Sequence, residues 1–174
     1  MFSGLKRRIG AMRTVTELCE GAERFALSDG QQQPGSEHFL LAALDLPDGL
    51  ARKAFLRIGV DADHIRPAIA QQYAQALTSI GIDSTVSCAV ASDTNPEQRR
   101  HFPPAGRASA IELLRRLSSN DLGLPNVTDL SGAVVVASIA SEQHSVAARA
   151  LRAMNIDLNR LREAAITEIQ SGAV

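Results

Sequence analysis

The chain contains an internal repeat. Residues 49–69, GLARKAFLRIGVDADHIRPAI, align with residues 145–165, SVAARALRAMNIDLNRLREAA, at a constant offset of 96. Small, apolar, basic and acidic positions coincide in the two copies: Ala51 with Ala147, Lys53 with Arg149, Ala54 with Ala150, Asp61 with Asp157, and Ile65 with Leu161. Self-similarity at a fixed offset is the sequence signature of a repeated structural unit. The repeat therefore predicts two similar units packed together.

Each copy also contains a segment that is apolar on every side. SEHFLLAAL (36–44) lies over SGAVVVASI (131–139) at an offset of 95. Such a segment predicts a short helix enclosed by the others. Taken alone, residues 134–136 are typical of a strand, because three valines follow one another. The repeat favours a helix there too.

Helical spacing and end signals give the remaining elements. Apolar residues at intervals of three and four predict a first helix, with one face formed by Met12, Val15, Leu18, Cys19, Ala22, Phe25 and Ala26. Gly30 should end this helix, and Ser36 should cap the next. Gly59 should end the third helix in a left-handed conformation, which Asn155 tolerates at the matching position. Asp61 or Asp63 should cap the fourth helix, whose inward face is Ile65, Ile69, Tyr73, Ala76 and Ile80.

These elements predict an all-α fold of two four-helix repeats related by a pseudo-twofold axis. The first repeat spans 1–80 and the second spans 108–174, with its own first helix at 108–117. The segment 81–107 is rich in Ser, Thr, Asn, Pro and Gly, which indicates a linker. Within that linker, STVSCAV could alternatively form a short strand.

Charge and composition exclude several classes of function. The net charge is −1 and is nearly balanced between the halves, so no broad basic field exists to bind nucleic acid. The basic cluster Lys6, Arg7, Arg8 and Arg13 is interpreted as a solvated helix start or terminus. No apolar run is long enough to span a membrane or to form a signal peptide. Cys19 and Cys88 form no CxxC pattern, which favours a reduced, cytoplasmic setting.

Catalytic and metal-binding patterns are missing from the sequence. His64, His101 and His144 are scattered, and none has a second ligand at metal spacing. Ser141, Glu142 and His144 lie in the loop before a repeat helix, where capping and solvation are the expected roles. The sequence has neither GxSxG nor a Cys-His arrangement, and no GxxxxGK[ST] loop for a nucleotide. We expect neither catalytic residues, nor a metal, nor a cofactor.

The order of these motifs resembles the Clp N-terminal repeat of the ClpA, ClpB and ClpC unfoldases. GSEHFLLAAL matches the family's Thr-Glu-His and apolar helix, with Ser36 in place of the Thr, and LARKAFLRIGVD follows as in the family. SVAARALRAMNID matches in the second copy, so the resemblance covers about 12–169. HFPPAGR (101–107) and the opening Met1-Phe2 also resemble family stretches. In the second copy, Gly132 and Ala133 stand where the family has Glu-His. The resemblance implies a stand-alone double Clp-N protein without an ATPase module.

The resemblance also implies a non-catalytic module that receives substrates or adaptors for a Clp ATPase. In ClpC-type domains the Glu of the Glu-His pair contacts phosphoarginine, a role that falls here on Glu37 beside Ser36 and His38. Physics alone places Glu37 and His38 in the exposed first turn of a buried helix, with a purely structural role as the other interpretation. The alternative function is a decoy or buffer that binds the same peptides or cyclic-peptide antibiotics without contacting a Clp machine.

A second candidate surface is aromatic. The family's surface for adaptors and cyclic peptides implies that Phe2 and Phe102 lie together where the repeats meet, with His101 nearby. One interpretation is that the two rings pack on each other and fasten the N-terminus to the linker. The other is an apolar patch that is open to a partner. Both require Phe2 and Phe102 to be neighbours.

Overall fold

A computed structural model describes the backbone of residues 2–79 and 130–171, and the side chains of 13–79 and 130–171. All elements in these ranges are helical, which confirms the all-α prediction. They are α1 (Phe2–Ser28), α2 (Ser36–Leu44), α3 (Leu50–Arg57), the 3₁₀ turn η1 (Ala62–His64), α4 (Ile65–Ser79), α6 (Gly132–Ala140), α7 (Val146–Ala153) and α8 (Leu158–Ser171). The helix predicted at 108–117, the linker 81–107 and its possible strand lie outside the described residues.

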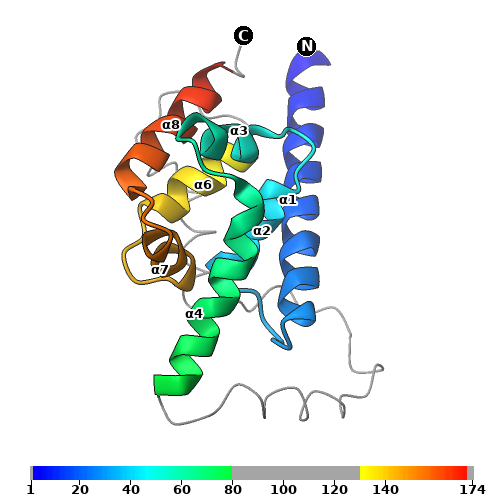
Figure 1. The fold of residues 1–174 in the computed structure, drawn as a ribbon. Coiled ribbons are helices and arrows are strands. Elements are labelled where there is room, and N and C mark those ends of the chain that lie inside the picture. Colours follow the sequence, from blue (N-terminus) through cyan, green and yellow to red (C-terminus); the bar gives the residue numbers. More distant parts are fainter. Residues whose placement is uncertain (1, 80–129, 172–174) are drawn as a thin grey trace.

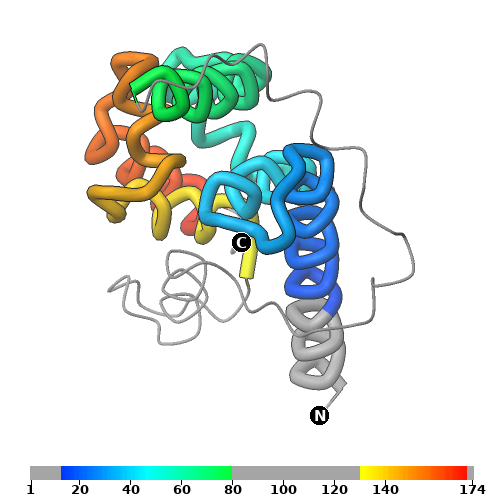
Figure 2. Tube along the Cα trace, turned by 90° about the horizontal axis from the view of Figure 1, so that it is seen from below, coloured from blue at the N-terminus to red at the C-terminus, as the bar shows by residue number. Residues whose placement is uncertain are grey.

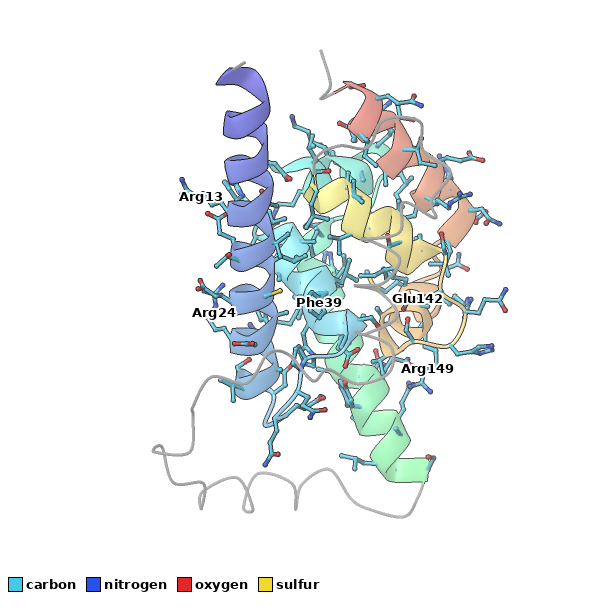
Figure 3. The ribbon with its side chains drawn as sticks, turned by 180° about the vertical axis from the view of Figure 1, so that it is seen from behind. Arg13, Arg24, Phe39, Glu142 and Arg149 are labelled. Atoms are coloured by element: carbon cyan, nitrogen blue, oxygen red, sulfur yellow. The ribbon has the colours of Figure 1, made fainter. Side chains whose placement is uncertain are left out.

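The two apolar helices, α2 and α6, form the centre of the molecule (Figure 1). All nine residues of each helix are buried, including the three valines that resemble a strand in isolation. α2 packs between α1 and α6, and Figure 3 shows Phe39 at this centre. The core around them consists of Leu, Ile, Val and Ala with the rings of Phe39 and Phe55. The prediction of two enclosed helices, with Leu40, Leu41, Leu44, Val135 and Ile139 buried, is confirmed.

The helices outside this pair make crossed contacts between the copies. α3 of the first copy packs on α8 of the second, and α4 of the first copy packs on α7 of the second. Figure 2 shows α4 and α7 side by side, on the side of the molecule away from α1. Reciprocal packing of this kind is what a twofold relation between the copies requires. The twofold axis itself stays a prediction.

The local geometry follows one offset, 96, from α2 onward. α6 begins 96 residues after α2, so Gly35 and Ser131 are the matching N-cap residues. The offset of 95 expected for this segment is therefore wrong by one residue. Ser36 is the first helical residue and not the cap. Asn155 has φ 59° where Gly59 has φ 78°, so the left-handed stop predicted for the third helix recurs in the second copy.

Several details of the first repeat differ from expectation. α1 begins at Phe2, well before the predicted stripe, and Val15 on that stripe is 43% exposed. Ala76 is also exposed, because the second half of α4 extends beyond the core. Asp61, not Asp63, caps the turn before α4 by accepting from the Asp63 N–H at 3.0 Å.

Glycine permits the closest approaches between helices. A Cβ on Gly132 would lie 2.8 Å from the Ala43 carbonyl oxygen and 3.0 Å from the Ala51 Cβ. A Cβ on Gly21 of α1 would lie 3.0 Å from the Ala42 Cβ. Interiors are packed to crystal density, so such contacts leave no room for an added methyl group. The small residues of α2, α3 and α6 thus bring the two copies together backbone to backbone.

Candidate functional site

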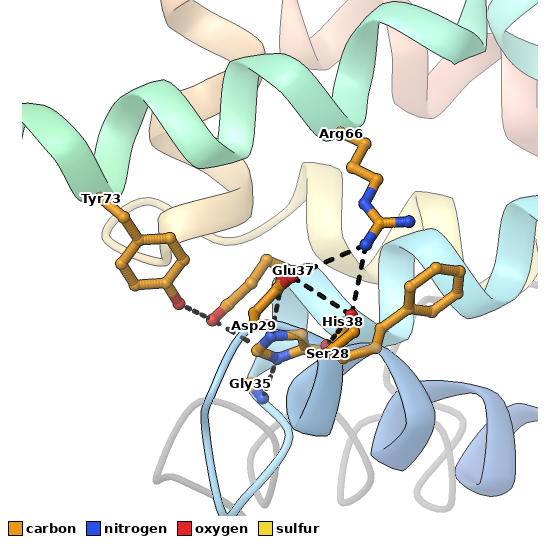
Figure 4. A network of polar contacts seen from close by, with 8 residues as sticks. Ser28, Asp29, Gly35, Glu37, His38, Arg66 and Tyr73 are labelled. Atoms are coloured by element: carbon orange, nitrogen blue, oxygen red, sulfur yellow. Dashed lines mark hydrogen bonds and ion pairs between the residues drawn. The ribbon is translucent and has the colours of Figure 1, made fainter. Parts of the chain in front are cut away.

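The candidate site is a polar network at the start of α2. It joins three elements: the end of α1 with Ser28 and Asp29, the first turn of α2 with Glu37 and His38, and α4 with Arg66 and Tyr73 (Figure 4). Glu37 is 1% exposed and His38 is 0% exposed. The expectation that this pair lies in an exposed first turn is therefore wrong, because the end of α1 and the side chains of α4 cover the start of the helix.

Polar contacts with neighbouring residues hold His38, including Glu37, whose Oε1 lies 3.6 Å from its Nδ1. Its Nδ1 accepts a hydrogen bond from the Gly35 N–H at 2.8 Å, and its Nε2 lies 3.5 Å from Asp29 Oδ2. An accepting Nδ1 corresponds to the imidazole tautomer whose hydrogen is on Nε2, the nitrogen that faces Asp29. The N–H that precedes the helix is thereby satisfied from within the next turn, as in a capping box. His38 thus binds both the loop that precedes α2 and the residue that follows α1.

Glu37 is held by its neighbours on two sides. The hydroxyl of Tyr73 on α4 donates a short hydrogen bond to its Oε1 (Figure 4). On another side, the carboxylate lies flat against Gly35, where a Cβ would come within 2.5–2.7 Å of its oxygens and carboxyl carbon. The position before Ser36 consequently has to be glycine for the carboxylate to lie there. Glu37 also stands in the first turn of α2, where the helix dipole favours a negative charge.

A second group of contacts ties α4 to the end of α1. The Arg66 guanidinium donates to the Ser28 hydroxyl at 3.2 Å and lies 3.7 Å from Asp29 Oδ1. It also lies over the Phe25 ring, 5.3 Å from the centroid, which is a cation–π distance. Arg66 and Tyr73 therefore bridge α4 to α1 and α2 mainly through side chains.

Residues 13–92 match the family model of the Clp repeat (R) N-terminal domain. This segment is a member of the Clp repeat family. The match includes the whole Glu37–His38 network and α1 from Arg13 onward. A Clp repeat is a binding domain and not a catalytic one, and its partners are the substrates and adaptors of Clp ATPases. A comparison of the chain with curated proteins found no match.

The second copy lacks this Clp repeat network. At the offset of 96, Ala133 and Val134 occupy the places of Glu37 and His38, and both are buried. The expected loss of the polar pair stands, but the substituted residues are one position later than expected. The anion at the start of α6 comes instead from the first copy, because Asp48 Oδ2 accepts from the Gly132 N–H at 2.8 Å. Asp48 Oδ1 also accepts from the Leu50 N–H at 2.9 Å, so one carboxylate serves two helix starts.

Of the predicted site residues, Ser36, Glu37 and His38 lie among the described side chains. Ser36 is fully buried, and its hydroxyl has no hydrogen-bond partner among the described residues. Phe2 is the first residue of α1, but its side chain lies outside the described part of the chain. Phe102 and His101 lie there as well, so the neighbourhood of Phe2 and Phe102 stays a prediction.

The loop with catalytic-looking residues has a structural role. Ser145 caps α7 by accepting from the Ala148 N–H at 3.1 Å, and Ser141 donates to the Ala137 carbonyl at 2.9 Å. Glu142 is 8% exposed and not solvated as expected, because at the offset of 96 it takes the place of buried Leu46. In the part of the chain that the structure describes, no group of three His, Cys, Asp or Glu residues could hold a metal ion. Within the same part, no helix has the length and apolar character needed to cross a membrane.

Sequence reasoning missed the partners that α4 and α1 supply. The sequence pattern places Tyr73 only on the inward stripe of the fourth helix, and it gives no sign that Asp29 and Arg66 lie at the site. One signal was available for Tyr73: it is the only tyrosine, on a stripe of isoleucine and alanine. A tyrosine on a buried face needs an acceptor for its hydroxyl. Which acceptor it would find depended on the packing of α4.

Proposed function

We propose that this chain is a non-catalytic module that receives protein substrates or adaptors for a Clp unfoldase–protease in the cytoplasm. The observation that supports the proposal is the family match over 13–92, which includes an intact Glu37–His38 pair. The small-residue interface among α2, α3 and α6 holds the two copies together. The module binds a protein partner, which is a Clp ATPase, an adaptor or a substrate protein.

The test of this proposal is a pull-down from the organism's own cytoplasm with a tagged chain. Co-purification of a Clp ATPase is the expected result. The amount of ATPase recovered should be unchanged by nuclease treatment. A core variant, Leu41→Asp, serves as the control for capture by misfolded protein, because Leu41 is 5% exposed. Capture of clients or cyclic-peptide antibiotics without any Clp ATPase would favour the alternative, a decoy or buffer for the same ligands.

The finer proposal concerns the ligand at Glu37. A phosphoarginine-type ligand presents several N–H donors to a carboxylate, and such paired hydrogen bonds are among the strongest in proteins. The first copy would bind it alone, since Ala133 and Val134 leave no matching carboxylate at the start of α6. Glu37→Gln should abolish binding of a phosphoarginine peptide, measured by calorimetry. Equal affinity of the variant and the wild type would remove Glu37 from the site.

The aromatic surface is a separate proposal. Phe2 and Phe102, with His101, would form an apolar patch for an adaptor or a cyclic peptide. If the patch binds a partner, Phe102→Ala should leave the melting temperature unchanged and weaken partner binding. If the two rings only pack on each other, the same variant should lower the melting temperature, since burying a Phe is worth about 1.5–3 kcal/mol.

A further inference from the structure

The hydroxyl of Tyr73 occupies the place that a ligand donor would need at Glu37. It donates to Glu37 Oε1, which is the kind of bond that a guanidinium N–H would make to the same oxygen (Figure 4). Gly35 lies against the carboxylate elsewhere, so that approach is closed by backbone. A ligand coming from the side of α4 therefore competes with Tyr73 for the same carboxylate oxygen.

The part of α4 that carries Tyr73 is less buried than the part before it. The fully buried residues of this helix, Ile65 and Ile69, lie in its first half, and no residue from 70 to 79 is buried. Tyr73 itself is half-buried at the edge of the core, and α4 packs mainly on α7 and little on α2. Displacement of the Tyr73 side chain would leave Ile65 and Ile69, the buried residues of α4, in place.

We propose that Tyr73 is an autoinhibitory contact that covers Glu37 and selects for ligands able to displace its hydroxyl. The inference rests on the proposed binding of arginine-type ligands at Glu37. A hydrogen bond to a carboxylate favours the state in which Tyr73 covers Glu37 by about 10- to 100-fold over the uncovered state. The apparent affinity of the site for a ligand falls by the same factor. A ligand with several N–H donors and a neighbouring anionic group displaces the hydroxyl, whereas a single weak donor does not.

The chain provides its own reporter for this contact. Tyr73 is the only tyrosine and the sequence has no tryptophan, so intrinsic fluorescence reports Tyr73 alone. Phenol emission is quenched when the hydroxyl donates to a carboxylate. Glu37→Gln should therefore raise the emission of the ligand-free protein, and a ligand that displaces the hydroxyl should do the same in the wild type.

The decisive experiment titrates a short phosphoarginine peptide, and its unmodified arginine counterpart, into five proteins. These are the wild type, Tyr73→Ala, Tyr73→Phe, the double variant Tyr73→Ala with Glu37→Gln, and the control Gln72→Ala. Gln72 is adjacent on α4 and bonds only to Gln75 among the described residues, at 3.2 Å. Far-UV circular dichroism checks that each variant is folded.

We expect Tyr73→Ala to bind the phosphoarginine peptide about 10- to 100-fold more tightly than the wild type, a difference of about 1.4–2.7 kcal/mol. Tyr73→Phe should gain less affinity because its ring still covers the carboxylate. Gln72→Ala should bind with the affinity of the wild type. The double variant should lose the affinity gained by Tyr73→Ala. Peptide binding to the wild type should raise tyrosine emission. Discrimination against the unmodified peptide should shrink in Tyr73→Ala.

Two kinds of result would overturn the inference. If the wild type binds the peptide but folded Tyr73→Ala binds it no more tightly, or binding leaves tyrosine emission unchanged, Tyr73 is not inhibitory although the proposed function stands. If neither protein binds the peptides, and the pull-down also captures no Clp ATPase or client, the proposed function fails and the role of Tyr73 fails with it.

Discussion

Gly132→Ala tests how closely the two copies approach. The added Cβ would lie 2.8 Å from the Ala43 carbonyl oxygen, 3.0 Å from the Ala51 Cβ and 3.2 Å from the Ala51 nitrogen. Two of these atoms belong to backbone, so relief requires α6 to move away from α2 and α3. Overpacking of this kind costs about 1–3 kcal/mol. The helix-propensity gain of alanine applies to helix interiors and offsets little here, because Gly132 is the first residue of α6.

Thermal unfolding followed by helical circular dichroism measures this cost. For a chain of this size, 1 kcal/mol lowers the melting temperature by about 2–4 °C, so a cost of about 1–3 kcal/mol predicts a decrease of about 2–12 °C. Gly21→Ala is the matched control. Its Cβ would lie 3.0 Å from the Ala42 Cβ and 3.6 Å from the Ala42 Cα, so it also meets crowding, but no backbone atom within 3.2 Å. Its mid-helix position gains about 1 kcal/mol in helix propensity, which offsets this crowding, so its stability should stay within about 1 kcal/mol of the wild type. An unchanged or raised melting temperature for Gly132→Ala would refute the close backbone packing of α6.

Three further predictions concern other parts of the fold. Leu41→Ala should lower the free energy of unfolding by about 2–5 kcal/mol in urea titrations, because Leu41 is buried and its removal leaves a cavity; a loss below 1 kcal/mol would contradict its core position. Asp48→Ala should cost about 1–3 kcal/mol by removing the acceptor for two helix starts, with Asp48→Asn recovering part of it. Burial, with Glu23 and Glu20 nearby, raises the pKa of the Cys19 thiol. In a Cys88→Ser background, alkylation of Cys19 at pH 8 should therefore be slower than alkylation of a model thiol, and it should accelerate as the pH rises. Alkylation at the rate of a model thiol would show that Cys19 is solvated.

The burial of Glu37 changes what its removal should do. A surface carboxylate at a helix start contributes only about 0.3–1 kcal/mol, which would make Glu37→Ala nearly neutral. In the structure, the same change leaves the Tyr73 hydroxyl without the carboxylate to which it donates, at a position that is 1% exposed. Losing a buried hydrogen-bond partner costs about 1–3 kcal/mol. Glu37→Gln is therefore the better probe of binding, because it keeps an acceptor oxygen.

The sequence by itself determined the local structure. Hydrophobic periodicity and helix-end signals depend on residues that are close in the sequence. The helices α2 and α3, and the left-handed helix end at Gly59 and Asn155, were therefore predictable. The repeat changed the prediction for the valine run, which resembles a strand, to a helix. The reason is that the matching segment of the first copy has a helical pattern of its own. That α2 and α6 are buried follows from their apolar residues on every side, which only enclosure can shield from water.

Only the tertiary structure decided what surrounds Glu37. Its covering partner, Tyr73, is 36 residues away on a helix whose direction depends on packing against the second copy. The register of α6 likewise depended on Gly132 fitting against Ala43 and Ala51, which a one-residue ambiguity in the alignment could not reveal. Periodicity indicates which face of a helix turns inward. Contacts between helices that are distant in the sequence depend on the side-chain volumes of both helices. Whether a carboxylate at a helix start is exposed or covered is therefore a property of the assembled fold.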